Sequence, residues 1–250
     1  MPIVATGSEP LPLRAWASLR LVLWFYGSQL AIAVAIVVVV MVGAGLRGHP
    51  VRMLSTEALL LATTVATIGS AWVVLRHLRA TLAGGAMPAI VAALGWRAAP
   101  LRPVLAWAAV GTLFSYGWVH LVVERLLPPT SQDLTTVSSV FAVQSLAGRG
   151  LLFAFAVGLA PPVEEFVFRG VLLTGLATSW GSLPGIAGST ALFALGHLDQ
   201  VGSYWPAFLG IVCIGLMTAA LCLRYRSLYP GWALHAAYNA TALLMAFGGS

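Results

Sequence analysis

Long apolar stretches without charge, separated by short polar connectors, dominate the sequence. The first runs from Leu21 to Leu46 and has 26 consecutive uncharged residues. A helix needs about 20 predominantly apolar residues to cross the hydrocarbon core of a bilayer. We therefore predict seven membrane-spanning helices, at residues 20–43, 57–76, 102–124, 150–178, 184–198, 205–223 and 229–247.

The fourth predicted span contains Pro161-Pro162 near its middle, which leaves two structures open. Proline removes a helical hydrogen bond, so the segment forms either one kinked helix or a short helix followed by a second. A second helix would add an eighth span and would invert the direction of every later helix. A kink beside Glu164 would accompany a polar cavity, since irregular backbone at membrane depth occurs where it lines one.

Two connectors are long. Residues 77–101 include an apolar patch, Ile90 to Trp96, that is too short to span and is predicted to lie at the membrane interface. Residues 126–149 are rich in Ser and Thr and are predicted as a loop or an amphipathic helix at the opposite surface.

Composition agrees with a membrane protein. The chain is 60% hydrophobic and 8% charged, whereas a soluble domain is about 25% charged. The predicted fold is all-α, a polytopic transmembrane bundle of about seven spans (six to eight) with a buried polar cavity. We expect one membrane domain over residues 1–250, with N-terminal spans and interfacial connectors at 20–149 and catalytic helices at 150–248.

The net charge of +6 comes from arginines that flank the apolar segments. This pattern indicates membrane topology and anionic lipid headgroups as partners, not nucleic acid. With the N-terminus inside, eight of these arginines lie on the inner side and four on the outer side, which favours a cytoplasmic N-terminus. The two cysteines, Cys213 and Cys222, share one apolar segment and indicate no disulfide framework.

Three charged residues, Glu164, Glu165 and Arg169, stand inside the fourth apolar segment. Ionisable groups at membrane depth are costly and by default mark a functional site. Glu165 and Arg169 are four residues apart and share a helix face, so we expect them to pair. Glu164 points about 100° away from Glu165 and is free to act as a general base. The alternative is that these charges form only a structural salt bridge.

Two more motifs follow in later apolar segments: Phe193-x-x-x-His197 and His235-x-x-x-Asn239. His197 alone is more typical of an interfacial residue than of a catalyst, and Asn239 is typical of a helix–helix hydrogen bond. Together with Glu164, the polar residues of these motifs provide groups to take a proton from water and to stabilise a developing oxyanion. Glu164, His197 and His235 would also suit zinc as ligands, so a metal site assembled across helices stays open.

In their order along the chain, Glu164-Glu165-x-x-x-Arg169, Phe193-x-x-x-His197 and His235-x-x-x-Asn239 resemble the motifs of the CAAX-protease and bacteriocin-processing (Abi) family of intramembrane proteases. That family includes the type II prenyl-protein endopeptidases. The resemblance covers about residues 164–239 and implies peptide-bond hydrolysis in a water-filled cavity within the membrane.

By this resemblance, Glu164 would activate water with the help of His197, while His235 and Asn239 would hold the oxyanion or orient the water. Glu165 and Arg169 would support the site. The family's mechanism is argued to be either metal-dependent or glutamate-based, so the resemblance leaves zinc undecided. Its bacterial members are diverse, and the prenyl-protein substrate is not carried over.

The leading hypothesis is therefore an intramembrane endopeptidase, an integral multi-pass protein of a bacterial cell membrane that acts on a peptide or membrane-protein substrate. One alternative is a non-proteolytic immunity or scaffold protein with the same fold. Another is a proton-coupled transporter, although no inverted repeat is visible in the sequence. The sequence makes no prediction of oligomeric state.

Overall fold

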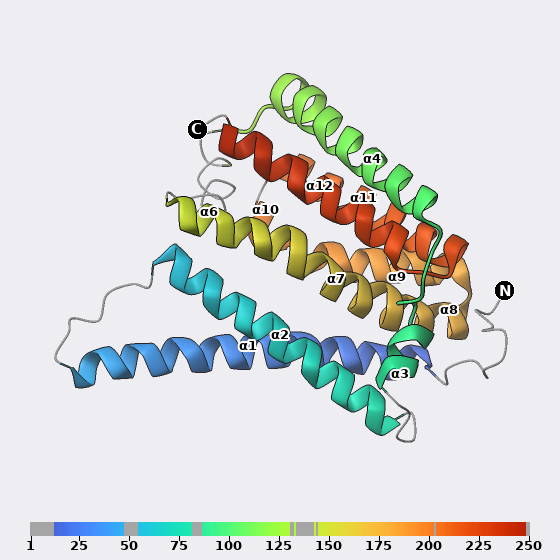
Figure 1. The fold of residues 1–250 in the computed structure, drawn as a ribbon, viewed down its shortest axis with the longest axis horizontal. Coiled ribbons are helices and arrows are strands. Elements are labelled where there is room, and N and C mark those ends of the chain that lie inside the picture. The colour runs from blue at the N-terminus through green and yellow to red at the C-terminus, as the bar shows by residue number, and fades with distance from the viewer. Residues whose placement is uncertain are drawn as a thin grey trace.

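Helices make up nearly all of the structure, a computed structural model that describes residues 13–47, 55–81, 87–130, 133, 143, 145–202 and 204–248. These residues contain no strand. In chain order (Figure 1), the helices are α1 (Ala15–Leu46), α2 (Thr56–Thr81), α3 (Met87–Ala93), α4 (Leu101–Gly117), η1 (Trp118–Leu126), α6 (Leu146–Phe153), η2 (Ala154–Leu159), α7 (Ala160–Glu164), η3 (Glu165–Leu173), α8 (Thr174–Trp180), α9 (Ser182–Leu195), α10 (Leu198–Val201), α11 (Trp205–Tyr225) and α12 (Tyr229–Gly248), where η marks π-helical segments.

The helices pack as a bundle in which consecutive long helices run back and forth (Figure 1). Each of the seven predicted spans coincides with helix over most of its length, and α12 lies along α4 while α1 lies along α2. Five helices of the described chain are long and apolar enough to cross a membrane. The prediction of an all-α membrane bundle is confirmed.

The segments α6, η2, α7, η3 and α8 form one continuous helix, Leu146–Trp180, of 35 residues. The alternative with a second, separate helix after the prolines is wrong. Pro161 and Pro162 lie inside this continuous helix, at the start of the α7 segment, where their missing N–H groups leave helical carbonyl groups without a donor. The π-helical segments on either side, η2 and η3, absorb the change in hydrogen-bond register. Widened turns of this kind are frequent at functional sites.

The fifth predicted span, residues 184–198, is shorter than expected. Its helix, α9, ends at Leu195 and has 14 residues, so it is about 21 Å long against a hydrocarbon core of about 30 Å. Gly196 and His197 form a turn after the helix, and α10 follows at once. His197 is therefore not within a spanning helix, because the chain turns before it reaches that position.

The apolar patch in the connector 77–101 packs into one end of the bundle instead of only lying at its surface. Ile90 and Leu94 are buried in the main core. The backbone N–H of Leu228 donates to the carbonyl oxygen of Gly95 at 2.9 Å. This contact fixes the turn that starts α12. The second long connector, 126–149, lies largely outside the described residues.

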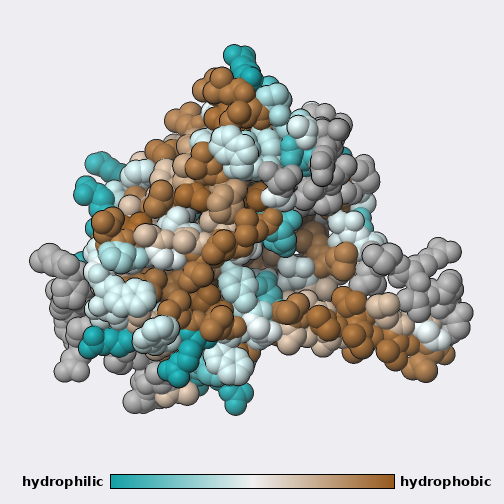
Figure 2. Space-filling model, turned by 180° about the vertical axis from the view of Figure 1, so that it is seen from behind, coloured by the Kyte–Doolittle hydropathy of each residue, from teal (hydrophilic) through white to brown (hydrophobic). Residues whose placement is uncertain are grey.

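The core is centred on η3, in which all nine residues are buried. Helices α1, α8, α9 and α11 pack against it. The outer surface, by contrast, is broadly apolar, and teal polar side chains gather mainly towards its edges (Figure 2). Such a surface fits a lipid environment, and η3 is the part of the bundle that lipid does not reach.

Candidate active site

The adjacent carboxylates Glu164 and Glu165 lie where α7 joins η3. The side chain of Glu165 is 1% exposed, and that of Glu164 is 21% exposed. Consecutive residues of a helix point about 100° apart. Glu165 accordingly faces the core, whereas Glu164 faces a cavity. The two carboxylates have the different surroundings that the sequence suggested.

Glu165 joins two partners from different helices. Its Oε2 lies 3.4 Å from Nε of Arg169, one turn along the same helix. Its Oε1 lies 3.1 Å from Nδ1 of His235 on α12. The predicted pairing with Arg169 is therefore present, and the contact with His235 is an addition that the sequence did not indicate. An ionised carboxylate only accepts hydrogen bonds, so Nδ1 of His235 carries the proton.

Arg169 is enclosed by the core. Its Nη2 donates to the carbonyl oxygen of Gly215 at 3.2 Å, and its guanidinium carbon lies 4.2 Å from the ring centroid of Phe193. The Nε–H is not aligned on Glu165 as a hydrogen bond, and Nε and Nη1 have no hydrogen-bond partner in the described chain. Arg169 is thus held by charge and by the aromatic ring, which attracts a cation to its face.

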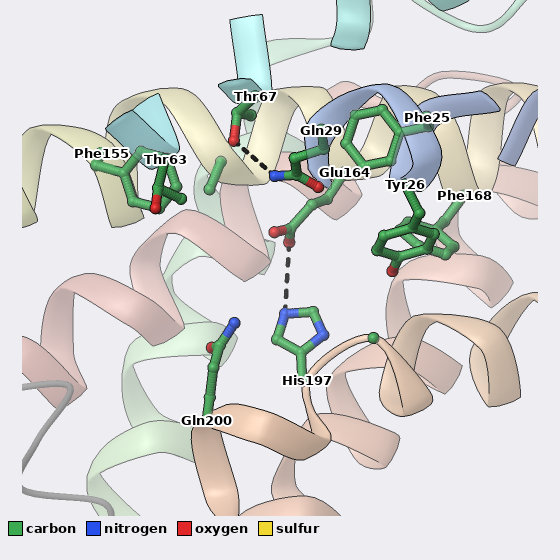
Figure 3. A pocket seen from close by; sticks show the side chains of 12 residues that line it. Phe25, Tyr26, Gln29, Thr63, Thr67, Phe155, Glu164, Phe168, His197 and Gln200 are labelled. Carbon is green, nitrogen blue, oxygen red and sulfur yellow. Dashed lines mark hydrogen bonds and ion pairs between the residues drawn. The ribbon is translucent and has the colours of Figure 1, made fainter. Parts of the chain in front are cut away.

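Glu164 faces two imidazole rings. Its Oε2 lies 3.9 Å from Nε2 of His197 and 3.7 Å from Nε2 of His235, and Figure 3 shows Glu164 and His197 pointing toward each other across the cavity. These distances exceed a direct hydrogen bond. They leave room for a water molecule that contacts both groups. The structure therefore brings Glu164, His197 and His235 together from three different helical regions.

The backbone and Glu165 set the tautomers of the two rings. Nδ1 of His197 lies 2.8 Å from the carbonyl oxygen of Phe193, which can only accept, so Nδ1 carries the proton. Nδ1 of His235 is held in the same way by Glu165. In the neutral rings, both Nε2 atoms therefore present lone pairs to Glu164. One water molecule has two hydrogens, so it can donate to Glu164 and to one of the two rings.

Glu164 and His197 line a cavity of about 110 Å³. One water needs about 10–15 Å³ of such volume, so the cavity has room for several. Its wall comes from α1, α2, the long helix, the turn after α9, and α10. The residues that line it are Phe25, Tyr26, Gln29, Thr63, Thr67, Phe155, Ala160, Glu164, Phe168, Gly196, His197 and Gln200. The expected buried polar cavity is therefore present beside Glu164.

Sequence reasoning missed the polar residues that α1 and α2 contribute to this wall. Tyr26 and Gln29 come from α1 and Thr67 comes from α2. Nε2 of Gln29 donates to Oγ1 of Thr67 at 2.9 Å (Figure 3). All three are uncharged, so a search for charged residues passed over them. Gln29 in the middle of an otherwise apolar run was the available signal.

Asn239 does not turn its amide nitrogen toward the carboxylates. It follows His235 by one turn on α12, and its Nδ2 donates to the carbonyl oxygen of Ala156 at 2.8 Å. The prolines explain this bond. The N–H of Ala160 reaches back five residues to Phe155, so the carbonyl of Ala156 would next pair with Pro161, which has no N–H. Asn239 supplies the missing donor.

Comparison with known protein families matches part of the chain. Residues 146–241 match the family model described as Rce1-like, type II CAAX prenyl endopeptidase. Over these residues the chain is similar to the CAAX-protease family. The Rce1-like domain begins at the first residue of the long helix and contains every residue predicted for the site. No curated protein and no solved structure gives a match.

The Rce1-like domain does not include the whole cavity. Its helices provide Glu164, His197 and Gln200, while Tyr26, Gln29 and Thr67 lie outside the matched residues. The apolar helices and the family together make the protein an integral membrane protein. Glu164 and His197 thus come from one part of the chain, and one wall of the cavity comes from another.

The donor groups of this site are of a chemical type that binds zinc, but their positions do not suit a zinc ion. A carboxylate with two imidazoles, whose other ring nitrogens are hydrogen-bonded, is a donor set that zinc uses in hydrolases. In the described chain, however, no three His, Cys, Asp or Glu side chains surround a common position that would hold a metal ion. The side chains as placed here do not fit a bound zinc ion.

Proposed function

We propose that the protein is an intramembrane endopeptidase, in which Glu164 activates water to hydrolyse a peptide bond. The observation that carries the proposal is the convergence of Glu164 with His197 and His235, at 3.9 and 3.7 Å, beside a cavity with room for water. The match of residues 146–241 to a family of endopeptidases supports it.

In the proposed reaction, a water molecule donates one hydrogen to Glu164 and the other to Nε2 of His197. As the water oxygen bonds to the carbonyl carbon, Glu164 takes its proton. The carbon–nitrogen bond then breaks, and Glu164 returns the proton to the leaving nitrogen. Positioned proton transfer of this kind contributes roughly 10²- to 10⁴-fold to rate.

His235 lies between Glu164 and the buried charges. Its Nδ1–H is held by Glu165, which in turn faces Arg169. The ring orientation is thereby fixed, with Nε2 toward Glu164. Glu165 and Arg169 act in this proposal as positioning residues, since neither lines the cavity.

The substrate we propose is a peptide segment presented at or within the membrane. The name of the matched family refers to prenylated substrates. The test therefore uses matched quenched-fluorescent peptides with and without a farnesyl thioether, together with comparative membrane proteomics of cells that carry wild type or Glu164→Gln. We expect new termini close to membrane segments that depend on Glu164.

The control is Glu124→Gln, because Glu124 is an exposed carboxylate that pairs with His120 away from the cavity. Wild type and this variant should cleave equally, and Glu164→Gln should be inactive. Equal cleavage by wild type and Glu164→Gln would refute the mechanism. An absence of any Glu164-dependent terminus or peptide product would refute the function.

A further inference from the structure

Tyr26 brings a phenol from outside the Rce1-like domain to the cavity. It lies on α1 and lines the cavity together with Glu164 and His197 (Figure 3). Its ring packs against Phe25 and Phe168, with centroid distances of 5.5 and 6.2 Å. These contacts fix the ring, and therefore the direction in which the hydroxyl points.

The Tyr26 hydroxyl lies directly against the backbone of Gly196, the residue before His197. A methyl group on Gly196 would overlap that hydroxyl. Only glycine therefore allows the phenol to come this close to the turn that carries His197. The hydroxyl is thus placed at the same edge of the cavity as one of the groups proposed to bind water.

This hydroxyl makes no hydrogen bond to a protein atom within the described chain. A polar group withdrawn from bulk water is costly unless it finds a partner. Because Tyr26 borders a cavity large enough for water, a molecule bound in that cavity can be its partner. Its O–H is therefore available to a substrate.

The ionisable groups proposed for the reaction lack a free donor for an oxyanion. Glu164 and the neutral Nε2 atoms of His197 and His235 are acceptors, and a proton added to Nε2 of His235 would point toward Glu164. One N–H of the Asn239 amide donates to the carbonyl oxygen of Ala156, and Asn239 does not line the cavity. Gln200 also lines the cavity, but it is exposed on the four-residue α10 and is not held in place.

We infer that Tyr26 is a further catalytic residue, whose hydroxyl donates a hydrogen bond to the oxyanion formed on the scissile carbonyl. The inference rests on the proposed endopeptidase function. A donor fixed before the reaction stabilises developing charge more effectively than a mobile one, because it does not have to reorganise. The carbonyl oxygen would lie between Tyr26 and the activated water, on the Gly196 side of the cavity.

The test is Tyr26→Phe, which removes the hydroxyl and keeps the ring. The matched control is Tyr238→Phe, because the Tyr238 hydroxyl also lies against a glycine, Gly210, but outside the cavity. Both proteins are purified and assayed on the quenched-fluorescent peptide that wild type cleaves. Removing one oxyanion donor typically lowers kcat by about 10²-fold or more.

We expect Tyr26→Phe to lower kcat by about 100-fold with little change in KM, and Tyr238→Phe to match wild type. A second readout is a phosphinate analogue of the same peptide, which mimics the tetrahedral intermediate. Tyr26→Phe should bind it more weakly than wild type, while its affinity for an uncleavable ground-state peptide is unchanged.

Cleavage by Tyr26→Phe within twofold of wild type would overturn the inference and leave the proposed function standing. Equal losses in the Tyr26 and Tyr238 variants would also overturn it, since they would show a packing effect. No cleavage by wild type would instead remove the proposed function, and the inference with it. If Tyr26→Phe folds poorly, Tyr26→Gln, which keeps a hydrogen-bond donor, is compared with Tyr26→Leu, which has none. The two variants are assayed at equal concentrations of folded protein. Equal turnover of the two would overturn the inference.

Discussion

Asn239 on α12 donates its amide N–H to the carbonyl oxygen of Ala156 on the long helix, 2.8 Å away. That carbonyl has lost its helical partner because residue 161 is proline. The bond ties the helix that carries His235 to the helix that carries Glu164, close to both residues. Asn239 therefore has a structural reason to be asparagine that is independent of substrate.

The first prediction concerns this bond. Asn239→Ala should lower the free energy of unfolding by about 1 kcal/mol, because it leaves a partly buried carbonyl without a donor. Thermal and denaturant unfolding in detergent measure the effect. Thr241→Ala is the control on the same helix, since Thr241 bonds only to the nearby carbonyl of Ala237.

Pro161→Ala makes this prediction sharper, because alanine restores a backbone N–H that can pair with Ala156. Asn239→Ala should then cost less in the Pro161→Ala background than in wild type. Additive effects of the two substitutions would contradict the proposed link. Loss of cleavage by Asn239→Ala with unchanged stability would assign Asn239 a direct part in the chemistry instead.

The second prediction separates the two glutamates. Glu165→Gln should destabilise the fold by about 3–5 kcal/mol, because it leaves the buried guanidinium of Arg169 without its counter-charge. Glu164→Gln should leave the unfolding temperature near that of wild type. Glu164 borders a cavity, and its nearest ionisable partners, His197 and His235, lie farther from it than Arg169 lies from Glu165. Thermal unfolding of both variants under identical conditions is the measurement.

Glu165→Gln combined with Arg169→Met provides the control for charge. Removing both buried charges should recover part of the lost stability, because neither group is then left unpaired. If the double variant recovers no stability, the loss in Glu165→Gln comes from the changed packing of the side chains and not from the unpaired charge. Equal destabilisation by Glu164→Gln and Glu165→Gln would contradict the division of roles.

The third prediction concerns the contact between α4 and α12. A methyl group on Gly111 would collide with the carbonyl oxygen of Leu234, the residue before His235. Gly111→Ala should push α12 outward, lower the free energy of unfolding by about 1–3 kcal/mol and reduce cleavage by displacing His235. Activity and unfolding are measured on the same preparation.

Gly117→Ala is the matched control, because Gly117 ends the same helix and a methyl group there meets no atom within 4 Å. It should retain wild-type stability and cleavage. Similar losses in both variants would show that alanine is poorly tolerated anywhere in α4, and the argument from the close contact would fail.

The fourth prediction concerns metal. Because no three donor side chains of the described chain surround a common position, we expect purified active protein to contain no stoichiometric zinc and to retain activity in a strong chelator. Elemental analysis and chelator titration measure this. Stoichiometric zinc that is lost in His197→Ala would show that the side chains rearrange around a metal.

Much of the fold could be predicted, because membrane thickness sets the length of an apolar helix. All seven predicted spans correspond to helices. One open question and one error arose where local backbone decides the outcome. Pro161 and Pro162 left open whether the fourth span was one helix or two, and two π-helical segments keep the helix continuous. The end of α9 at Leu195 was missed, because apolar residues continue almost to His197.

The site was predicted where charge or helical spacing marked it. The pairing of Glu165 with Arg169 followed from their spacing on one helix. The contact of Glu165 with His235 did not, because it depends on how α12 docks against η3. Tyr26 and Thr67 were missed for a similar reason: their positions relative to Glu164 are set by packing between helices far apart in the sequence.

The cavity wall built by α1 and α2 bears on how cleavage preference can evolve. Tyr26, Gln29 and Thr67 lie outside the residues that match the family. Selection can therefore alter the first two helices while the water-activating groups stay the same. Homologues that have similar residues 146–241 and a tyrosine in the place of Tyr26, but differ elsewhere in the first two helices, would share a reaction and differ in the peptides they cleave. A chimera that exchanges α1 and α2 but keeps this tyrosine should transfer cleavage preference from one homologue to another.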